Sequence, residues 1–187
     1  MQESAVYEHI YIEASEQNPV LRAEENFFEV VRSLPPDSIV CCLDGDDWLA
    51  HPDVLAGIEA IYDIWPSTLV TYGSFVFADG RPGFAAPVQW PPRQHAWTAT
   101  HLKTFKAGLY QKIRPEDILS FPLARDLAMM FPLLEMAGPE RSVFNPTIDY
   151  VYNYGASWEF NTASRADLAR EQVYVKQLRS MKEYTCV

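Results

Sequence analysis

SIVCCLDGDDWL, residues 38–49, is the stretch that decides the expected fold. Its first half is an apolar run typical of a buried strand, and the run ends in Asp44, Asp46 and Asp47, with Gly45 between the first two. Neighbouring carboxylates repel one another unless a cation or a charged ligand joins them. Hard oxygen ligands suit Mg²⁺ or Mn²⁺, which also take substrate phosphates. Because open α/β sheets bind ligands outside the carboxyl ends of their strands, the stretch predicts a metal–diphosphate site.

The segments around this stretch alternate between strand and helix patterns. Residues 7–14 alternate and are rich in aromatic and β-branched side chains, which predicts a strand, and residues 21–34 carry apolar side chains at helical spacing. With residues 39–43 as the second strand, buried on both faces, this order predicts a βαβ unit with a right-handed crossover. The later patterns predict helices from Pro52 to about Tyr62 and over 99–113, 124–137 and 167–184, strands over 69–77 and 148–154, and a loop over 87–97.

Length and a hydrophobic fraction of 48% indicate one globular domain over residues 1–187, and the alternating strand and helix patterns make its class α/β. The net charge of −10 argues against a nucleic-acid partner, which needs a basic face. No apolar run approaches the roughly 20 residues that span a membrane, and the acidic N-terminus lacks a secretory signal pattern. Cys41 and Cys42 are adjacent and Cys186 is distant, so no disulfide framework is expected. These features favour a cytoplasmic, reducing location.

The acidic run has two interpretations. The Asp-x-Asp spacing of Asp44 and Asp46 puts two side chains on the same side of an extended segment, where a metal between them could bridge to a diphosphate. The alternative is a helix N-cap cluster, which is the favoured interpretation for Asp47 because it precedes the next helix. Capping does not easily account for Asp44, which lies at the strand end itself.

Four downstream residues have side chains suited to a transfer reaction. Asp126 opens an apolar helix, where it either caps the helix or acts as a general base near an acceptor hydroxyl, and local sequence alone favours capping. His101 could contact substrate or phosphate, and Lys103 could neutralise phosphate. Trp97 could stack on a sugar ring. Taken alone, His101 and Lys103 are more often structural or solvated, and Trp97 is equally consistent with packing. Glu135, further along the same helix, is expected to be solvated or ion-paired.

Two early segments resemble motifs of the family 2 glycosyltransferases, which have the GT-A nucleotide-sugar fold. LDGDDWL at 43–49 looks like the DxD segment of that family, and EQNPVLRAEEN at 16–26 is similar to the ExN-containing stretch that precedes it. This chain has Pro19 and Val20 where glycine is usual and Glu25 where arginine is usual.

Three later segments extend the resemblance in the same order along the chain. WTATHLKTF at 97–105 looks like the acceptor-side His-Leu-Arg-Thr-Phe segment of some members. Asp126 and the helix up to residue 138 resemble the family's ED motif, with Arg125 in place of the first acid. VYN at 151–153 is similar to the strand that follows. The DxD pattern alone is weak, whereas five segments in order are strong.

The resemblance implies an inverting, metal-dependent glycosyltransferase with a mixed sheet flanked by helices. Asp44 and Asp46 would hold the ribose and a Mn²⁺ or Mg²⁺ on the diphosphate of a UDP- or GDP-sugar, with Lys103 on the same donor side. Asp126 would deprotonate the hydroxyl of a sugar or glycan acceptor. Trp97 and His101 would lie on the acceptor side.

One departure from the family concerns the start of the chain. Members begin with a strand, a helix and a second strand that hold the nucleobase, which occupy roughly 50 to 60 residues, whereas about six residues precede the first predicted strand here. The resemblance therefore implies an N-terminally abbreviated fold with an open sheet edge. Such an edge favours association with a second copy or another chain, or a domain swap.

Two other functions were weighed against the transferase. A degenerate GT-A-like domain that binds sugars or proteins without turnover is consistent with the abbreviated start. A phosphatase with an Asp-x-Asp nucleophile is disfavoured, because the threonine and lysine context that such an enzyme needs does not follow the acidic run.

Overall fold

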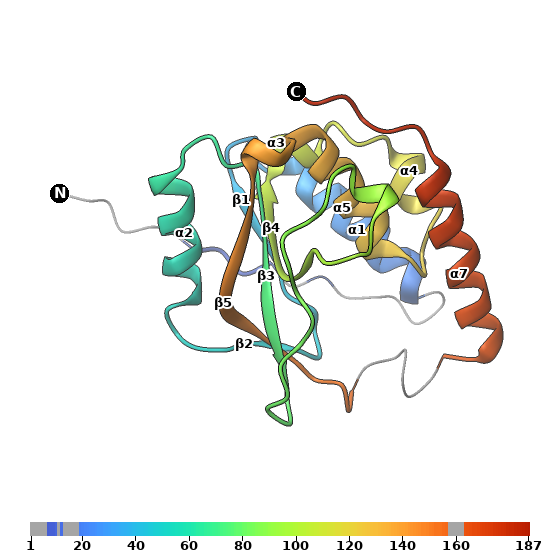
Figure 1. Ribbon diagram of the computed structural model, residues 1–187, viewed down its shortest axis with the longest axis horizontal. Helices are drawn as coiled ribbons and strands as arrows, with labels where there is room; N and C mark the ends of the chain where they lie inside the picture. The colour runs from blue at the N-terminus through green and yellow to red at the C-terminus, as the bar shows by residue number, and fades with distance from the viewer. Residues whose placement is uncertain (1–6, 11, 13–18, 157–162) are drawn as a thin grey trace.

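The computed structural model describes residues 7–10, 12, 19–156 and 163–187, without the side chains of residues 19–23 (Figure 1). The helices are α1 (Pro19–Ser33), α2 (Val54–Ile64), α3 (Ala107–Tyr110), α4 (Pro115–Leu119), α5 (Arg125–Ala137) and α7 (Arg165–Ser180), with short 3₁₀ turns η1 (Pro92–Gln94) and η2 (Pro139–Arg141). The strands are β1 (Ile39–Cys42), β2 (Trp48–Leu49), β3 (Val70–Phe77), β4 (Thr100–Lys106) and β5 (Ser142–Tyr152). The fold is mixed α/β, as the sequence predicts.

The five strands form one sheet in the order β1-β4-β3-β5-β2. β4 pairs antiparallel with both β1 and β3, β3 pairs parallel with β5, and β5 pairs antiparallel with β2. The acidic turn of residues 43–47 connects β1 at one edge of the sheet to β2 at the other. This crossing brings the turn past the end of β5, where the candidate site lies.

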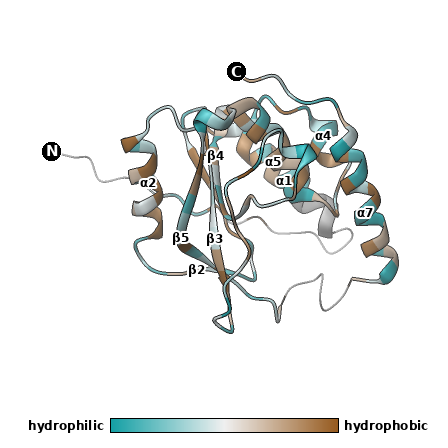
Figure 2. Cartoon of the chain, in the orientation of Figure 1, coloured by the Kyte–Doolittle hydropathy of each residue, from teal (hydrophilic) through white to brown (hydrophobic). Residues whose placement is uncertain are grey.

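Helices cover both faces of the sheet, with α2 on one side and α1, α3, α4 and α5 on the other (Figure 1). On the first face, Val54 and Ile58 of α2 pack against Phe75, Leu102 and Tyr150 of the strands. The opposite face holds the larger core cluster, in which the strands contact α1, α3, α4 and α5. Hydrophobic residues recur along the strands, α2 and α5, whereas α7 is more mixed (Figure 2).

The predicted N-terminal βαβ unit is wrong in the part of the chain that the structure describes. Residues 7–10 and 12 are not in a strand, and residues 11, 13 and 14 lie outside the described residues. β1 therefore pairs only with β4, and no strand among the described residues lies along its other edge. The predicted burial of β1 on both faces is confirmed only in part, because its side chains pack against core clusters on both faces but none is fully buried, and Ile39 is 36% exposed.

The predicted helix over residues 99–113 is wrong for most of its length. Thr100–Lys106 forms β4 between β1 and β3, and only Ala107–Tyr110 is helical. Leu102 and Thr104 face α2, while Phe105 faces the opposite core, so the side chains alternate at the period of a strand. Pairing with two neighbouring strands outweighs the local helical pattern here.

The remaining predicted elements are present with shifted ends. These are α1, α2, β3, the loop containing η1, α5 ending at Gly138, a β5 that begins six residues earlier at Ser142, and α7 ending at Ser180. The three cysteines are free thiols, as predicted. No helix in the described ranges is both long and apolar enough to cross a membrane.

Candidate functional site

The acidic turn after β1 is held by a tyrosine from β5. The Asp44 amide donates to the Tyr150 hydroxyl oxygen at 3.3 Å, and that hydroxyl lies 2.6 Å from Oδ2 of Asp47 and 3.3 Å from Oδ2 of Asp44. The Asp47 amide in turn donates to the Asp44 carbonyl at 3.1 Å. The two carboxylates are thus bridged by one phenol.

Asp47 does not cap α2, so the capping interpretation is wrong for it. The cap position of α2 is Asp53, and the Asp47 carboxylate instead accepts from Tyr150 and, at 2.7 Å, from the Asn153 amide. Burial raises the pKa of Asp47 above its usual range, and these two hydrogen bonds limit the rise. Asp47 therefore ties the turn to the end of β5.

Asp126 at the start of α5 forms an ion pair with Lys103 of β4. Lys103 Nζ lies 2.5 Å from Asp126 Oδ1, and the side chains are 3% and 47% exposed respectively. Burial by itself raises the pKa of Asp126, but the charge of Lys103 and then that of His101 lower it to about 2. Burial disfavours the charged form of Lys103, yet the negative charges of Asp126 and Asp44 raise its pKa overall. Both groups are therefore charged near neutral pH.

His101 lies against the ring of Tyr150. Their centroids are 4.4 Å apart with the planes 17° from parallel, and Phe75 contacts the imidazole edge-on at 5.7 Å. Burial and then the nearby charge of Lys103 lower the pKa of His101 to about 4. The imidazole is consequently neutral at pH 7.

Arg125 links the start of α5 to α1. Its Nη1 donates to Glu24 Oε1 at 2.8 Å, and the side chains are 48% and 12% exposed. Asp44 and Asp126 are among the charges that raise the pKa of Arg125 against the effect of burial. Arg125 stands where the family resemblance expects an acid, and it pairs with an acid from the ExN-like stretch. Residues 16–18 of that stretch lie outside the described residues.

The structure thus brings four of the predicted site residues together: Asp44, His101, Lys103 and Asp126. The charges of these residues shift one another's pKa values, because the end of β1, β4 and the start of α5 meet at this place. Asp46 is exposed within the same turn.

Trp97 and Glu135, also singled out in the sequence, lie in packed surroundings. Trp97 packs edge-on against Phe131 at 5.4 Å and contacts the core, and its acceptor-side role stays a prediction. Glu135 is buried in an ion pair with Arg93, which the sequence allowed as one of two outcomes.

A divalent cation fits this turn only through a few protein ligands. Within the described residues, no group of three or more His, Cys, Asp or Glu side chains is arranged to hold an ion. Mg²⁺, however, uses one or two carboxylates and takes its other ligands from water and phosphate. Since Asp47 is engaged by Tyr150 and Asn153, Asp44 and Asp46 are the carboxylates left for a cation.

No known protein family matches this chain, and no curated protein matches it at significant similarity. The family resemblance of the sequence motifs therefore stays a prediction.

Tyr150 is the site residue that sequence reasoning missed. The local pattern only places it in the strand predicted over residues 148–154, and its side chain is fully buried. The polar partners of its hydroxyl come from residues 106 and 103 positions earlier, so no local pattern indicates them. The available signal is a tyrosine in a predicted strand, whose hydroxyl needs a partner if the side chain is buried.

Proposed function

We propose that this chain is a glycosyltransferase domain that moves a sugar from a nucleoside diphosphate sugar to an acceptor hydroxyl. The observation that carries the proposal is the convergence of Asp44, Lys103 and Asp126, which belong to three motif-like segments far apart in sequence. An acidic turn for the donor and a carboxylate beside it for the acceptor are the two parts that such a transfer requires.

Asp126 is the proposed general base. It takes the proton of the acceptor hydroxyl while the acceptor oxygen forms a bond to the anomeric carbon and the bond to the diphosphate oxygen breaks. The diphosphate leaves with the bonding electrons, and attack opposite to the leaving group inverts the configuration. His101, neutral at pH 7, is proposed to hydrogen-bond the acceptor.

Asp44 and Asp46 are proposed to hold the donor through its ribose and a Mn²⁺ or Mg²⁺. A bound divalent cation would supply charge stabilisation to the departing diphosphate. Lys103 is the proposed partner for a donor phosphate. With a pKa of about 2, Asp126 is a weak base while it is paired with Lys103. We expect an anionic donor beside Lys103 to weaken that pairing and so strengthen the base.

The same ion pair favours a second candidate, a domain that binds a sugar or a nucleotide without turnover. A carboxylate neutralised by a buried lysine is stable without substrate, and structural ion pairs also shift pKa values. The two candidates agree on ligand binding and differ on the role of Asp126.

Calorimetric titration with UDP- and GDP-sugars, with and without Mn²⁺, tests donor binding. We expect binding that needs Mn²⁺, that weakens by about tenfold or more in Asp46→Ala, and that is unchanged in Asp53→Asn, a control carboxylate at the start of α2. Failure of every nucleotide to bind would contradict both the donor site and the transfer.

Release of the nucleoside diphosphate, with water as acceptor, tests turnover. Asp126→Asn should still bind the donor, because Asp44, Asp46 and Lys103 are kept, and should lose about 10²- to 10⁴-fold in release, the usual contribution of a general base. Donor binding with no release from the native chain would instead support the non-catalytic domain.

A further inference from the structure

The hydroxyl of Tyr150 contacts the acidic turn at three atoms. It accepts from the Asp44 amide at 3.3 Å and lies within hydrogen-bonding distance of carboxylate oxygens of Asp44 and Asp47, at 3.3 and 2.6 Å. Its ring stacks on His101. One side chain therefore contacts a donor-side carboxylate through its hydroxyl and the acceptor-side histidine through its ring.

We propose that Tyr150 is a positioning residue, whose hydroxyl sets Asp44 for the donor and whose ring sets His101 for the acceptor. The inference rests on the proposed function for its catalytic meaning. Tyr150 touches Asp44, Asp47 and His101 and acts through them, because it is fully buried and does not reach the solvent-exposed side of the turn.

Charge explains why a phenol suits this position. Asp44 and Asp47 are both acidic and lie within reach of one oxygen, so without a donor between them they would repel each other. A phenol has an ordinary pKa of about 10. The phenol therefore keeps its proton at working pH and remains a hydrogen-bond donor to the turn.

Strand pairing on both sides fixes the position of Tyr150 relative to the turn. β5 pairs with β2 at Tyr150 and with β3 at the same residue, so the backbone of Tyr150 is held on both sides. The turn of residues 43–47, by contrast, is mostly exposed and has no strand pairing of its own. Within the turn the Asp47 amide donates to the Asp44 carbonyl, and side-chain contacts tie the turn to the sheet, with the Tyr150 hydroxyl supplying the one that bridges Asp44 and Asp47.

Tyr150→Phe in the full chain tests the inference, because it removes the hydroxyl and keeps the ring on His101. The matched control is Tyr62→Phe, which removes another buried hydroxyl, one that is hydrogen-bonded to Thr104 at 2.9 Å instead of to the turn. Mutating a residue that hydrogen-bonds a metal ligand typically lowers metal affinity or activity by about 10- to 100-fold. We expect the donor KM and the half-saturating Mn²⁺ concentration to rise about tenfold in Tyr150→Phe alone.

Three readouts separate positioning from simple stability. The melting temperature should fall by similar amounts in both variants, whereas only Tyr150→Phe should change the donor KM, measured as release of the nucleoside diphosphate with water as acceptor. Hydrogen–deuterium exchange of peptides covering residues 43–49 should speed up in Tyr150→Phe and not in Tyr62→Phe. If Tyr150→Phe does not fold, Asp47→Asn weakens the other end of the same bridge and should raise the donor KM likewise.

Two results would overturn the inference. One is equal donor KM in Tyr150→Phe and Tyr62→Phe, and the other is unchanged exchange over residues 43–49. If the native chain binds no nucleotide, the proposed function fails, while the exchange comparison still decides whether Tyr150 orders the turn.

Discussion

Glu135→Gln is expected to destabilise the protein strongly, because it removes the charge that balances buried Arg93. The two side chains are 3% and 2% exposed, and the pair is bidentate, with Arg93 Nε 2.5 Å from Oε1 and Nη2 3.0 Å from Oε2. Glu135 also accepts from the Tyr184 amide at 3.0 Å. Arg93 donates to the Leu178 carbonyl, so the pair connects α5, η1 and the C-terminal helix α7.

The expected loss in free energy of unfolding follows from the unpaired charge that Glu135→Gln leaves on Arg93. Breaking a buried ion pair leaves an uncompensated charge and costs about 3–5 kcal/mol. Glutamine keeps the volume and one oxygen acceptor, so we expect about 3 kcal/mol. At about 2–4 °C per kcal/mol for a chain of this size, the melting temperature should fall by about 6–12 °C.

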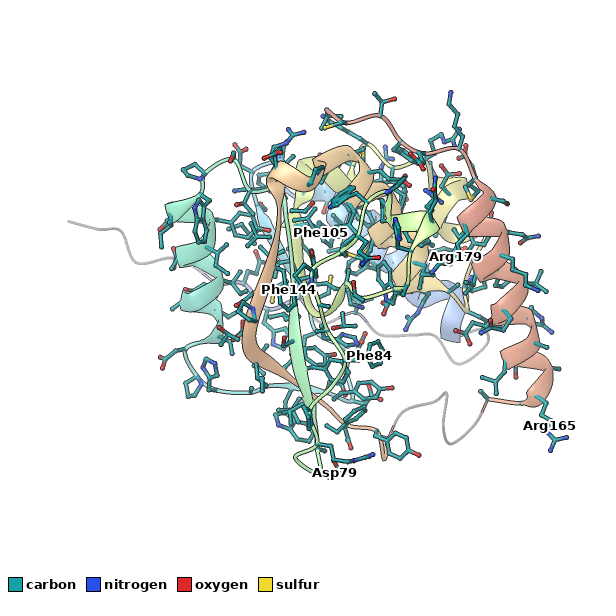
Figure 3. All side chains as sticks on the ribbon, in the orientation of Figure 1. Asp79, Phe84, Phe105, Phe144, Arg165 and Arg179 are labelled. Atoms are coloured by element: carbon teal, nitrogen blue, oxygen red, sulfur yellow. The ribbon has the colours of Figure 1, made fainter. Side chains whose placement is uncertain are left out.

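Urea denaturation with an exposed ion pair as control provides the assay. Asp79→Asn breaks the contact of Asp79 with Arg81, which is also short, at 2.7 Å, but whose side chains are 55% and 64% exposed. Asp79 lies at the tip of the turn after β3, remote from α7 (Figure 3). Asp79→Asn should leave the free energy of unfolding nearly unchanged. A loss below about 1 kcal/mol in Glu135→Gln, or equal losses in both variants, would refute the reasoning about burial.

Further predictions concern two glycines and the dependence of stability on pH. Gly138 ends α5 at φ 72° and ψ 170°, a conformation that side chains rarely adopt, so Gly138→Ala should lower the free energy of unfolding by about 1–3 kcal/mol. Gly57 lies exposed within α2 with open space at its Cβ position, so Gly57→Ala should raise the free energy of unfolding by about 0.5–1 kcal/mol in the same urea assay. A change of the same sign in both glycine variants would contradict the argument. The folded-state pKa of His101, about 4, lies below its ordinary 6.5, so as pH falls from 6.5 towards 4 the unfolded chain takes up the proton first and stability is lost. The urea midpoint of His101→Phe should fall less between pH 7 and pH 4.5 than that of the native chain. Equal falls in the two proteins would count against the lowered pKa of His101.

α7 shows how a predicted element acquires its place only through long-range contacts. Its helix was predicted from local pattern, and Ser164 and Asp167 form a capping box at its start. Its docking depends on Arg179, which donates to the carbonyls of Arg93 and His95 and points toward η1 (Figure 3). No periodicity in residues 165–180 indicates those partners.

β4 shows the opposite case, in which the local pattern was interpreted wrongly. The apolar and long side chains of residues 99–113 fit helical spacing, and the strand period was overlooked. The free edges of β1 and β3 on either side supply backbone partners for β4, and this gain outweighs helix propensity.

The sequence by itself determined the mixed α/β class, most helices, the acidic turn after β1 and the residue types suited to a transfer site. These follow from periodicity and composition, which are local properties of the chain. Only the tertiary structure decided that Lys103 pairs with Asp126, that Arg93 pairs with Glu135, and that Tyr150 bridges the acidic turn. The physical reason is that the partners lie far apart in the sequence and meet only once the strand order and the docking of the helices are set, which depends on packing over the whole chain.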